Sequence, residues 1–262
     1  MRYVSFTFDD GRANNYEEAF PIMKQYNLTG TIYCTTGYID GTWHPEPTKW
    51  KSAGEPLTTT QLCELSAAGW ELGLHGDKHI TDVEDLNAAL AKMNEWGFGS
   101  KAFGFSMPDS VSEEKKYKDF VKRYLGREIL YIRKGRKTDT GKLINKFLFA
   151  SYSMLGCQTA YNYFNKQNVI RADQIDPENI YTVVIRSEDK PEMITRFLEQ
   201  LPDETWIIFM FHSILRETHP LYGSDSWYWN SERFNSLCLA INDMIEKGSL
   251  YATNVSDMIN KL

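Results

Sequence analysis

Near its amino terminus the chain reads Val4-Ser5-Phe6-Thr7-Phe8-Asp9-Asp10-Gly11, and this stretch decides the fold. Apolar residues alternate with polar ones along it, which is the period of a β-strand with one buried face. The strand ends in two adjacent carboxylates, and burying such charges costs free energy unless a cation or a chemical role compensates them. An Asp-Gly pair can also simply open a turn, so the stretch alone leaves both interpretations of Asp9 and Asp10 open.

Two further apolar segments also end in ionisable residues. The segment Gly69–Leu74 has the pattern of a short strand and leads into His75 and His79. Neutral imidazole is the commonest metal ligand, and two histidines four residues apart can converge on one ion, although exposed pairs at this spacing more often face solvent. The run Trp206–Phe211 has the length of a buried strand and ends at His212. Three predicted strands therefore carry two aspartates and three histidines at their carboxyl ends.

Taken together, these motifs resemble those of the NodB-type polysaccharide deacetylases, carbohydrate esterase family 4. The likeness extends from residue 2 to about residue 110 and resumes near residue 180, and the order and separation of the motifs make it fairly specific. The segments that carry it are Thr7–Gly11, Gly30–Gly37, His75-x-x-x-His79, Ala102–Pro108 and Phe211-His212.

The resemblance implies an α/β fold, namely a distorted, incomplete (β/α) barrel whose site lies at the carboxyl ends of the strands. It also implies a metal-dependent hydrolase that removes N-acetyl groups from an acetamido sugar. In that reading Asp10, His75 and His79 bind a divalent ion, with zinc expected first and cobalt, nickel or manganese as alternatives. Asp9 would accept the proton of the attacking water, and His212 would protonate the departing amine.

The third motif departs from the family pattern. The family usually has an arginine two residues before the proline, where it is thought to orient the catalytic aspartate, and this sequence has Ser106 there. Pro108 is kept and is expected in the substrate pocket. Asp109 and Ser110 replace the usual aromatic residue and glycine, and Gly76 replaces a hydroxyl residue between the two histidines. The metal ligands are therefore intact, while the orientation of the base is in question.

A later segment offers replacements for the missing arginine. The predicted strand Tyr181–Ile185 runs into charged residues that would lie at the mouth of a parallel barrel. Arg186 is a candidate to supply the charge absent at Ser106, and Asp189 or Glu188 is a candidate to orient the histidine of the last motif. The alternative is that these residues only begin the next helix, where acidic side chains favour its dipole.

Aromatic and basic segments elsewhere allow both structural and functional readings. Trp227 and Trp229, in an aromatic cluster after the last motif, are expected to contact the sugar, although packing of their loop onto the barrel is equally compatible with the sequence. For the basic run Arg133–Lys137 we expect a solvated loop rather than an anion site, and for His44 an ordinary loop position. An aromatic cluster at Tyr161–Phe164 is expected in a helix core.

Composition indicates one domain over residues 1–262, a length that α/β barrels often reach. The net charge of -6 and pI near 5.5 argue against nucleic acid as a partner. The cysteines are scattered without zinc-knuckle or disulfide spacing. No membrane segment is predicted, and a strand that begins by residue 3 leaves no room for a signal peptide, so we expect a cytoplasmic protein.

The pattern of the remaining chain alternates strands with helices, as in parallel βα units. Helices are predicted at residues 14–26, 58–69, 83–96, 113–125, 191–201 and 231–247, and strands at 30–36, 101–107, 128–133, 181–185 and 250–253, before a final helix.

Two alternative functions remain open at this point. Related barrels hydrolyse other C–N bonds, so the same metal site could serve a small-molecule amidohydrolase acting on cyclic ureides. A pseudoenzyme that binds glycans without turning them over would explain the missing arginine. The sugar, the chain length and the oligomeric state are not specified by the sequence.

Overall fold

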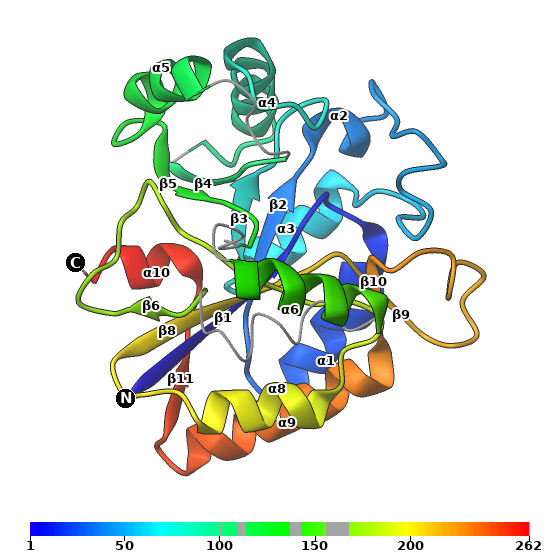
Figure 1. Ribbon diagram of the computed structural model, residues 1–262. Coiled ribbons are helices and arrows are strands. Elements are labelled where there is room, and N and C mark those ends of the chain that lie inside the picture. The colour runs from blue at the N-terminus through cyan, green and yellow to red at the C-terminus, as the bar shows by residue number, and fades with distance from the viewer. Residues whose placement is uncertain (100, 109–113, 137–142, 156–167, 262) are drawn as a thin grey trace.

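A computed structural model of the protein describes residues 1–99, 101–108, 114–136, 143–155 and 168–261. Its centre is a curled β-sheet surrounded by helices, the distorted, incomplete (β/α) barrel that the sequence predicts (Figure 1). The strands of this sheet are β1 (Arg2–Phe8), β2 (Thr31–Cys34), β3 (Glu71–Leu74), β4 (Phe103–Ser106), β5 (Ile129–Arg133), β6 (Ile170–Arg171), β7 (Val183–Val184), β8 (Thr205–Phe211) and β11 (Leu250–Ala252).

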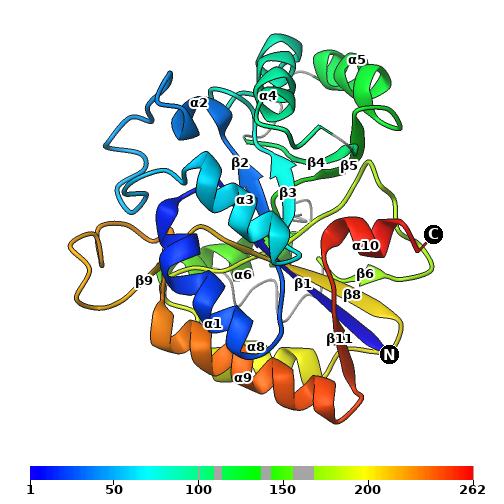
Figure 2. The ribbon, with the colours of Figure 1, turned by 180° about the vertical axis from the view of Figure 1, so that it is seen from behind.

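The main part of the sheet has the order β5-β4-β3-β2-β1-β8, and all neighbours in it are parallel. Strand β7 continues this arrangement beside β8, whereas β6 pairs with β8 in the antiparallel direction. Strand β11 pairs with the first half of β1, which brings the two ends of the chain to the same side of the molecule (Figures 1 and 2). Parallel strands place all their carboxyl ends at one edge of the sheet, where the candidate residues follow.

The barrel closes through an irregular segment rather than through a full strand. The backbone N–H of Ile132 in β5 donates to the carbonyl of Pro177 at 2.7 Å, and that of Lys134 donates to the carbonyl of Ile180 at 2.7 Å. These bonds bring the outer edge of β5 next to the segment that precedes β7. The carboxyl ends of β5 and β7 therefore belong to the same rim as the end of β1.

Helices connect the parallel strands and cover the outside of the sheet. They are α1 (Phe20–Gln25), α2 (Thr36–Ile39), α3 (Thr59–Ala67), α4 (Val83–Glu95), α5 (Glu114–Tyr124), α6 (Leu143–Met154), α8 (Pro191–Glu199), α9 (Ser231–Glu246) and α10 (Val255–Ile259). Thr58 caps α3, and its side chain and that of Gln61 form a reciprocal capping box. Helices α8 and α9 pack against each other on one side of the barrel (Figure 1). Within the described ranges, none of these helices has both the length and the apolar character needed to cross a bilayer.

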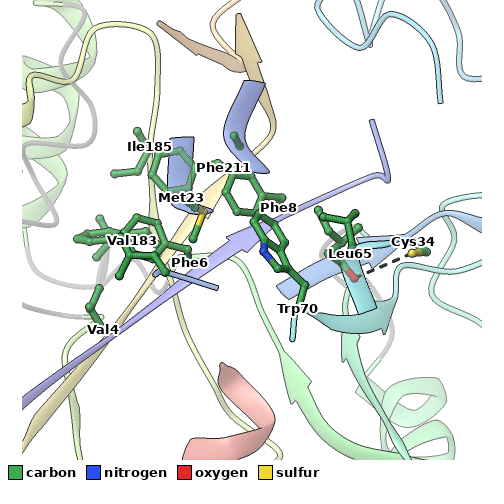
Figure 3. Packing of buried hydrophobic residues seen from close by; sticks show 14 of the residues in the cluster. Val4, Phe6, Phe8, Met23, Cys34, Leu65, Trp70, Val183, Ile185 and Phe211 are labelled. Atoms are coloured by element: carbon green, nitrogen blue, oxygen red, sulfur yellow. Dashed lines mark hydrogen bonds between the residues drawn. The ribbon is translucent and has the colours of Figure 1, made fainter. Parts of the chain in front are cut away.

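The alternation in β1 separates two kinds of interior. Phe8 stacks on Trp70 and on Phe211 of β8, with ring centres 5.4 and 5.5 Å apart, in the core between the sheet and the helices (Figure 3). Ser5 and Thr7 point the other way, and their hydroxyls donate to backbone carbonyls at 2.6 and 2.8 Å. One face of β1 therefore anchors the helices, and the polar face lines the inside of the curled sheet.

Tyr33 and Tyr131 fill the inside of the sheet. Their hydroxyls are 2.7 Å apart, and Tyr131 donates to the partly buried Glu71 at 2.6 Å. The rings need space in neighbouring strands, because a Cβ added to Gly104 would lie 2.1 Å from the Tyr131 ring and one added to Gly73 would lie 2.5 Å from Tyr33. The absence of side chains at these two glycines thus leaves room for the two tyrosine rings inside the sheet.

Most predicted elements are confirmed within a few residues, and two differ. The helix predicted over 14–26 is divided into a π-helical turn, Asn15–Ala19, and α1, because Pro21 has no N–H for the regular ladder. The strand predicted at 181–185 is reduced to Val183–Val184. The predicted helix around Tyr161–Phe164 lies outside the described residues.

Candidate metal centre and active site

The candidate residues meet because they follow neighbouring parallel strands. Phe8 of β1 is in register with Phe211 of β8, which places Asp9 beside His212. The backbone N–H of His75 donates to the carbonyl of Cys34 at 2.8 Å and continues the ladder from β3 to β2. All these ends open into one cavity of about 1130 Å³. Asp9, Asp10, His75, His79, Pro108, Arg186, His212 and Trp227 line it.

A turn at the end of β1 allows both aspartates to face the same cavity. Asp10 and Gly11 have φ angles of 79° and 78°, in the left-handed region. For a residue with a side chain this conformation costs roughly 1–2 kcal/mol, so the fold must hold it in place. The carbonyl of Gly11 accepts from the backbone N–H of Leu57 at 2.8 Å. Such a held, unfavourable conformation is typical of functional positions.

Asp10, His75 and His79 form a group with the geometry of a metal site. The Oδ1 atom of Asp10 lies 3.4 Å from Nε2 of His75 and 3.6 Å from Nε2 of His79. Two ligands held about 2.0–2.1 Å from a tetrahedral ion are separated by roughly 3.3 Å, so this spacing fits a zinc-like centre. Asp10 Oδ1 is buried and has no hydrogen-bond partner among the described residues. A cation at this point would satisfy it.

The two histidines are positioned by the loop that joins them. Nδ1 of His75 lies 2.8 Å from the carbonyl of Ser106, which can only accept, so Nδ1 carries the proton and Nε2 keeps its lone pair for an ion. The Asp85 carboxylate accepts from two backbone N–H groups of the loop, those of Asp77 at 2.8 Å and Lys78 at 2.7 Å. A side chain at Gly76 would lie 2.3 Å from that carboxylate, which explains the glycine there.

Arg12 holds the other oxygen of Asp10, a contact that the sequence motifs did not predict. Its Nε and Nη2 lie 2.9 and 2.7 Å from Asp10 Oδ2, and Nη1 donates to Ser213 at 2.7 Å. Burial acts to raise the pKa of Asp10, but the Arg12 guanidinium, followed by the nearby histidines, holds it well below its usual value. The carboxylate therefore stays ionised, with Oδ2 fixed by Arg12 and Oδ1 directed at the two histidines.

Arg133 places a guanidinium beside Asp9 and Ser106, so the prediction of a solvated loop is wrong for this residue. It is the last residue of β5 and is 1% exposed. Its Nη2 donates both to Asp9 Oδ1 and to the hydroxyl of Ser106, and its guanidinium lies 4.7 Å above the ring of Tyr33. Arg133 and Ser106 are register partners in β5 and β4. The guanidinium therefore comes from β5 rather than from the neighbouring strand β4. At the β4 position where the family pattern has arginine, Ser106 accepts a hydrogen bond from it.

The predicted role of Arg186 is consequently wrong, because Arg133 supplies the charge beside Ser106. The Arg186 guanidinium lies 3.6 Å from the centre of the Trp227 ring and donates to Ser226 at 2.9 Å. The predicted role of Asp189 is also wrong. Its carboxylate accepts from the backbone N–H of Arg186 at 2.7 Å, while His212 Nδ1 is buried and has no hydrogen-bond partner in the described part of the chain.

His212 lies on the cavity wall against Trp227, with ring centres 4.5 Å apart. Removal from water lowers the pKa of His212 to about 4, and the Asp10 charge offsets this only in part. Its imidazole is therefore neutral at pH 7 in the metal-free protein.

The two tryptophans predicted to contact substrate have different environments. Trp227 lines the cavity beside His212. Trp229 is 1% exposed, packs against Phe211 with ring centres 5.7 Å apart, and donates from Nε1 to the carbonyl of Asp189 at 2.9 Å. The prediction is wrong for Trp229, because it lies in β10 (Tyr228–Asn230), which pairs with β9 (Ser213–Leu215) and directs this ring into the core.

Comparison with known proteins identifies the same family. The family model described as "Polysaccharide deacetylase" matches residues 1–132. The curated protein "Putative polysaccharide deacetylase YxkH" of Bacillus subtilis (strain 168) is 30% identical over 77 residues. That match covers 29% of this chain and 23% of the relative, so it spans less than a quarter of the relative's length.

Solved structures share the fold. A family 4 acetyl xylan esterase from Clostridium thermocellum, solved with a cobalt ion, aligns with a TM-score of 0.51 at 11% identity, over 99% of this chain and 91% of that one. BA3943 from Bacillus anthracis, described as a CE4 family pseudoenzyme, aligns with a TM-score of 0.49 at 11% identity, over 98% of this chain and 65% of that one. The first of these alignments shows the same architecture along nearly the whole length.

Proposed function

The chain belongs to the polysaccharide deacetylase family, and from this premise we propose that it is a single-domain, metal-dependent hydrolase that removes N-acetyl groups from an acetamido sugar in a glycan or glycan precursor. One observation carries the proposal. Asp10, His75 and His79 converge within 4.8 Å of one another, and Asp9 and His212 line the same cavity. This arrangement provides an ion site, a base and an acid around one point.

Asp10, His75 and His79 would hold a divalent ion, with zinc expected first on the basis of the Asp-His-His donor set. Such an ion lowers the pKa of a coordinated water towards roughly 7 and polarises an acetyl carbonyl. The protein supplies the remaining requirements. Arg12 keeps Asp10 ionised, and the carbonyl of Ser106 keeps Nε2 of His75 available as a ligand.

Asp9 is placed to act as the general base. Arg133 binds its Oδ1, and its Oδ2 lies 4.0 Å from Nε2 of His75, on the side of the proposed ion. The oxygen that faces the ion is thus the one left to accept a proton from the attacking water. Arg133 is a positioning residue in this scheme, because it acts through the Asp9 carboxylate.

His212 is placed to protonate the leaving amine. An amine leaves poorly without a proton, and the imidazole lies on the cavity wall across from the carboxylates. Because His212 is neutral at pH 7 in the resting protein, it must take up a proton from solvent before it can pass one to the departing amine. Negative charge that develops on the acetyl oxygen would raise the pKa of His212 and favour this transfer.

Two observations favour this function over the alternatives. The charge absent at Ser106 is present at Arg133, which removes the reason to regard the chain as a pseudoenzyme. The cavity of about 1130 Å³ exceeds the usual range for small ligands, roughly 300–1,000 Å³, which favours a sugar over a cyclic ureide.

The test is acetate release from purified protein. N-acetylglucosamine oligomers of increasing length, an O-acetylated xylan and a cyclic ureide would be offered to protein loaded with zinc or cobalt, with chelator-treated protein as the control. We expect acetate only from acetamido sugars, loss of activity with chelator, and recovery when the ion is returned. Ureide hydrolysis without acetate release would support the amidohydrolase, and glycan binding without any turnover would support the pseudoenzyme.

A further inference from the structure

The cavity carries an excess of positive charge in an otherwise acidic protein. Seven Lys or Arg residues line it against three Asp or Glu residues, although the whole chain has a net charge of -6. A cleft lined by one sign of charge concentrates ligands of the opposite sign. The excess therefore bears on what the cavity binds.

Three of these cations are compensated by acidic residues of the same cavity. Arg12 pairs with Asp10, Arg133 pairs with Asp9, and Lys49 pairs with Glu46 at 3.1 Å. Of the other four, Lys134 donates to the side chain of Asn179 at 2.5 Å, and Lys78, Arg136 and Arg186 also line the cavity.

Arg186 is the cation whose surroundings are most informative. Its guanidinium is half-buried on the Trp227 ring, and the only side-chain hydrogen bond it makes within the described ranges is to Ser226. No described carboxylate lies within 4.0 Å of it. Three acids act on its charge, Glu188 first, then Asp189 and Asp225. Asp189 accepts from the backbone N–H of Arg186, and Asp225 accepts from the backbone N–H groups of Ser52 and Trp227.

A second guanidinium, that of Arg136, lines the same cavity. Burial lowers the pKa of Arg186, and burial together with the charge of Arg186 lowers the pKa of Arg136, while the Glu188 carboxylate offsets both shifts only in part. Two half-buried guanidinium groups repel each other, and a bound anion would offset that repulsion. The planar fork of arginine matches carboxylate and phosphate oxygens in pairs.

We propose that the substrate carries an anionic group, a carboxylate or a phosphate, close to its acetamido group, and that Arg186 and Arg136 bind this anion. The anion is placed close to the acetamido group because Arg186 and His212, the proposed acid, both contact the indole of Trp227. The anion thus belongs to the reacting sugar or its immediate neighbour. The proposal deepens the proposed deacetylase function and rests on it.

The experiment compares acetamido substrates that differ in charge, with protein loaded with zinc. The neutral probe is N,N′-diacetylchitobiose, and the anionic probes are N-acetylglucosamine linked to glucuronic acid and N-acetylglucosamine 1-phosphate. We expect kcat/KM to be about 10- to 100-fold higher for one anionic probe than for the neutral one, mainly through KM, since hydrogen bonds to charged groups contribute about 1.5–3 kcal/mol. The anionic probe with the larger kcat/KM relative to the neutral probe shows whether the site prefers a carboxylate or a phosphate.

Variants test which residues provide the preference. In Arg186→Met the ratio of anionic to neutral kcat/KM should fall towards one, and in Arg186→Lys it should be intermediate, because the charge remains while the fork is lost. Arg136→Met should reduce the ratio as well. Arg171→Met removes an exposed arginine paired with Asp173 and is the matched control, for which the wild-type ratio is expected. A wild-type ratio near one, or an Arg186→Met ratio equal to that of wild type, would overturn the proposal.

A binding measurement separates failure of this inference from failure of the deacetylase function. Calorimetric titration of the same probes into metal-free protein requires no turnover. If no probe releases acetate but the anionic sugar still binds at least tenfold more tightly than the neutral one, and Arg186→Met abolishes the difference, the anion site stands and the proposed reaction fails. Equal binding of anionic and neutral probes would reject the anion site whatever the activity.

Discussion

The guanidinium of Arg133 donates to the Asp9 carboxylate from the end of β5, and the Ser106 hydroxyl binds the same nitrogen from the end of β4. The family position for this charge is that of Ser106, so the chain has preserved the contact while changing the strand that delivers it. The Asp9 carboxylate, the proposed base, is therefore held by Arg133 at Oδ1, while its Oδ2 faces His75.

Arg133→Met is expected to lower kcat by roughly one to three orders of magnitude, comparable to the loss of an orienting or oxyanion group. Metal content should not change, because Arg133 makes no contact with the proposed ligand atoms in the described structure. Arg133→Lys should recover part of the activity. The measurement is acetate release alongside metal analysis, with Arg127→Met, at an exposed position, as the control.

The same substitution leaves a buried carboxylate without its partner, which typically costs about 3–5 kcal/mol of unfolding free energy. Arg133→Met combined with Asp9→Asn should recover much of that stability without recovering activity. Full activity in Arg133→Met would show that Arg133 does not position the Asp9 carboxylate for the reaction.

The metal site predicts that His75→Ala and His79→Ala each lose the bound ion. Wild-type protein should carry about one divalent ion per chain, or bind one at micromolar concentration or tighter. Removal of one of three ligands should weaken binding by orders of magnitude, whereas His44→Ala, at an exposed loop position, should leave metal content unchanged. Retention of the ion by both ligand variants, measured by mass spectrometry of dialysed protein, would contradict this assignment.

The sequence was sufficient to place residues whose position depends on local order. Asp9, Asp10, His75 and His212 follow strands that are recognisable from alternation or apolar length, and parallel strands bring their carboxyl ends together. The barrel and the candidate metal group could therefore be predicted before any coordinates were known.

Residues whose role depends on lateral pairing could not be predicted in this way. Arg133 ends a predicted strand, but its neighbour is known only once β5 lies beside β4 in register with Ser106. Arg12 contacts Asp10 because consecutive left-handed residues fold the chain back on itself. In the sequence Trp229 cannot be distinguished from an aromatic residue of a loop. Its place in the core is evident only from the pairing of β10 with β9. Basic or aromatic character alone does not distinguish a solvated loop from a buried contact.

The two tryptophans give a prediction that separates packing from binding. Trp229→Ala should destabilise the protein by about 3–5 kcal/mol, because the whole indole is buried. Trp227→Ala should change stability far less but raise KM by up to about tenfold, through loss of stacking at the cavity wall. Urea unfolding and substrate kinetics on both variants would measure this, and a Trp229→Ala protein as stable as wild type would contradict its assignment to the core.

The depressed pKa of His212 predicts a pH dependence of stability. The folded protein binds this proton only near pH 4, whereas the unfolded chain binds it near 6.5, so acid favours unfolding between these values. The contribution is fully present above pH 6.5 and is lost as pH falls to about 4, by up to about 3 kcal/mol. His212→Asn should therefore lose less unfolding free energy than wild type over this range.

The comparison requires metal-free protein and a difference between variants, because His75 acts in the opposite direction. Burial tends to lower the pKa of His75, but the carboxylates of Asp9 and Asp10 raise it above 6.5. His44→Asn, at an exposed loop position, is the control variant. Parallel curves of stability against pH for wild type and His212→Asn would show that the imidazole titrates normally.

The adjacent aspartates give the last prediction, because the structure assigns each a different guanidinium. Asp10→Asn replaces an anionic ligand with a neutral amide and leaves Arg12 without its ion pair, so metal affinity should fall and excess ion should restore part of the activity. Asp9→Asn keeps the ligand group intact but removes the proton acceptor. It should bind the ion as wild type does while kcat falls by roughly two to four orders of magnitude, and excess ion should not restore it. Asp203→Asn, at an exposed position, serves as the control in both assays. If Asp9→Asn is the metal-deficient variant, the two roles are exchanged, and if both variants remain active, neither carboxylate acts as proposed even though the fold places them together.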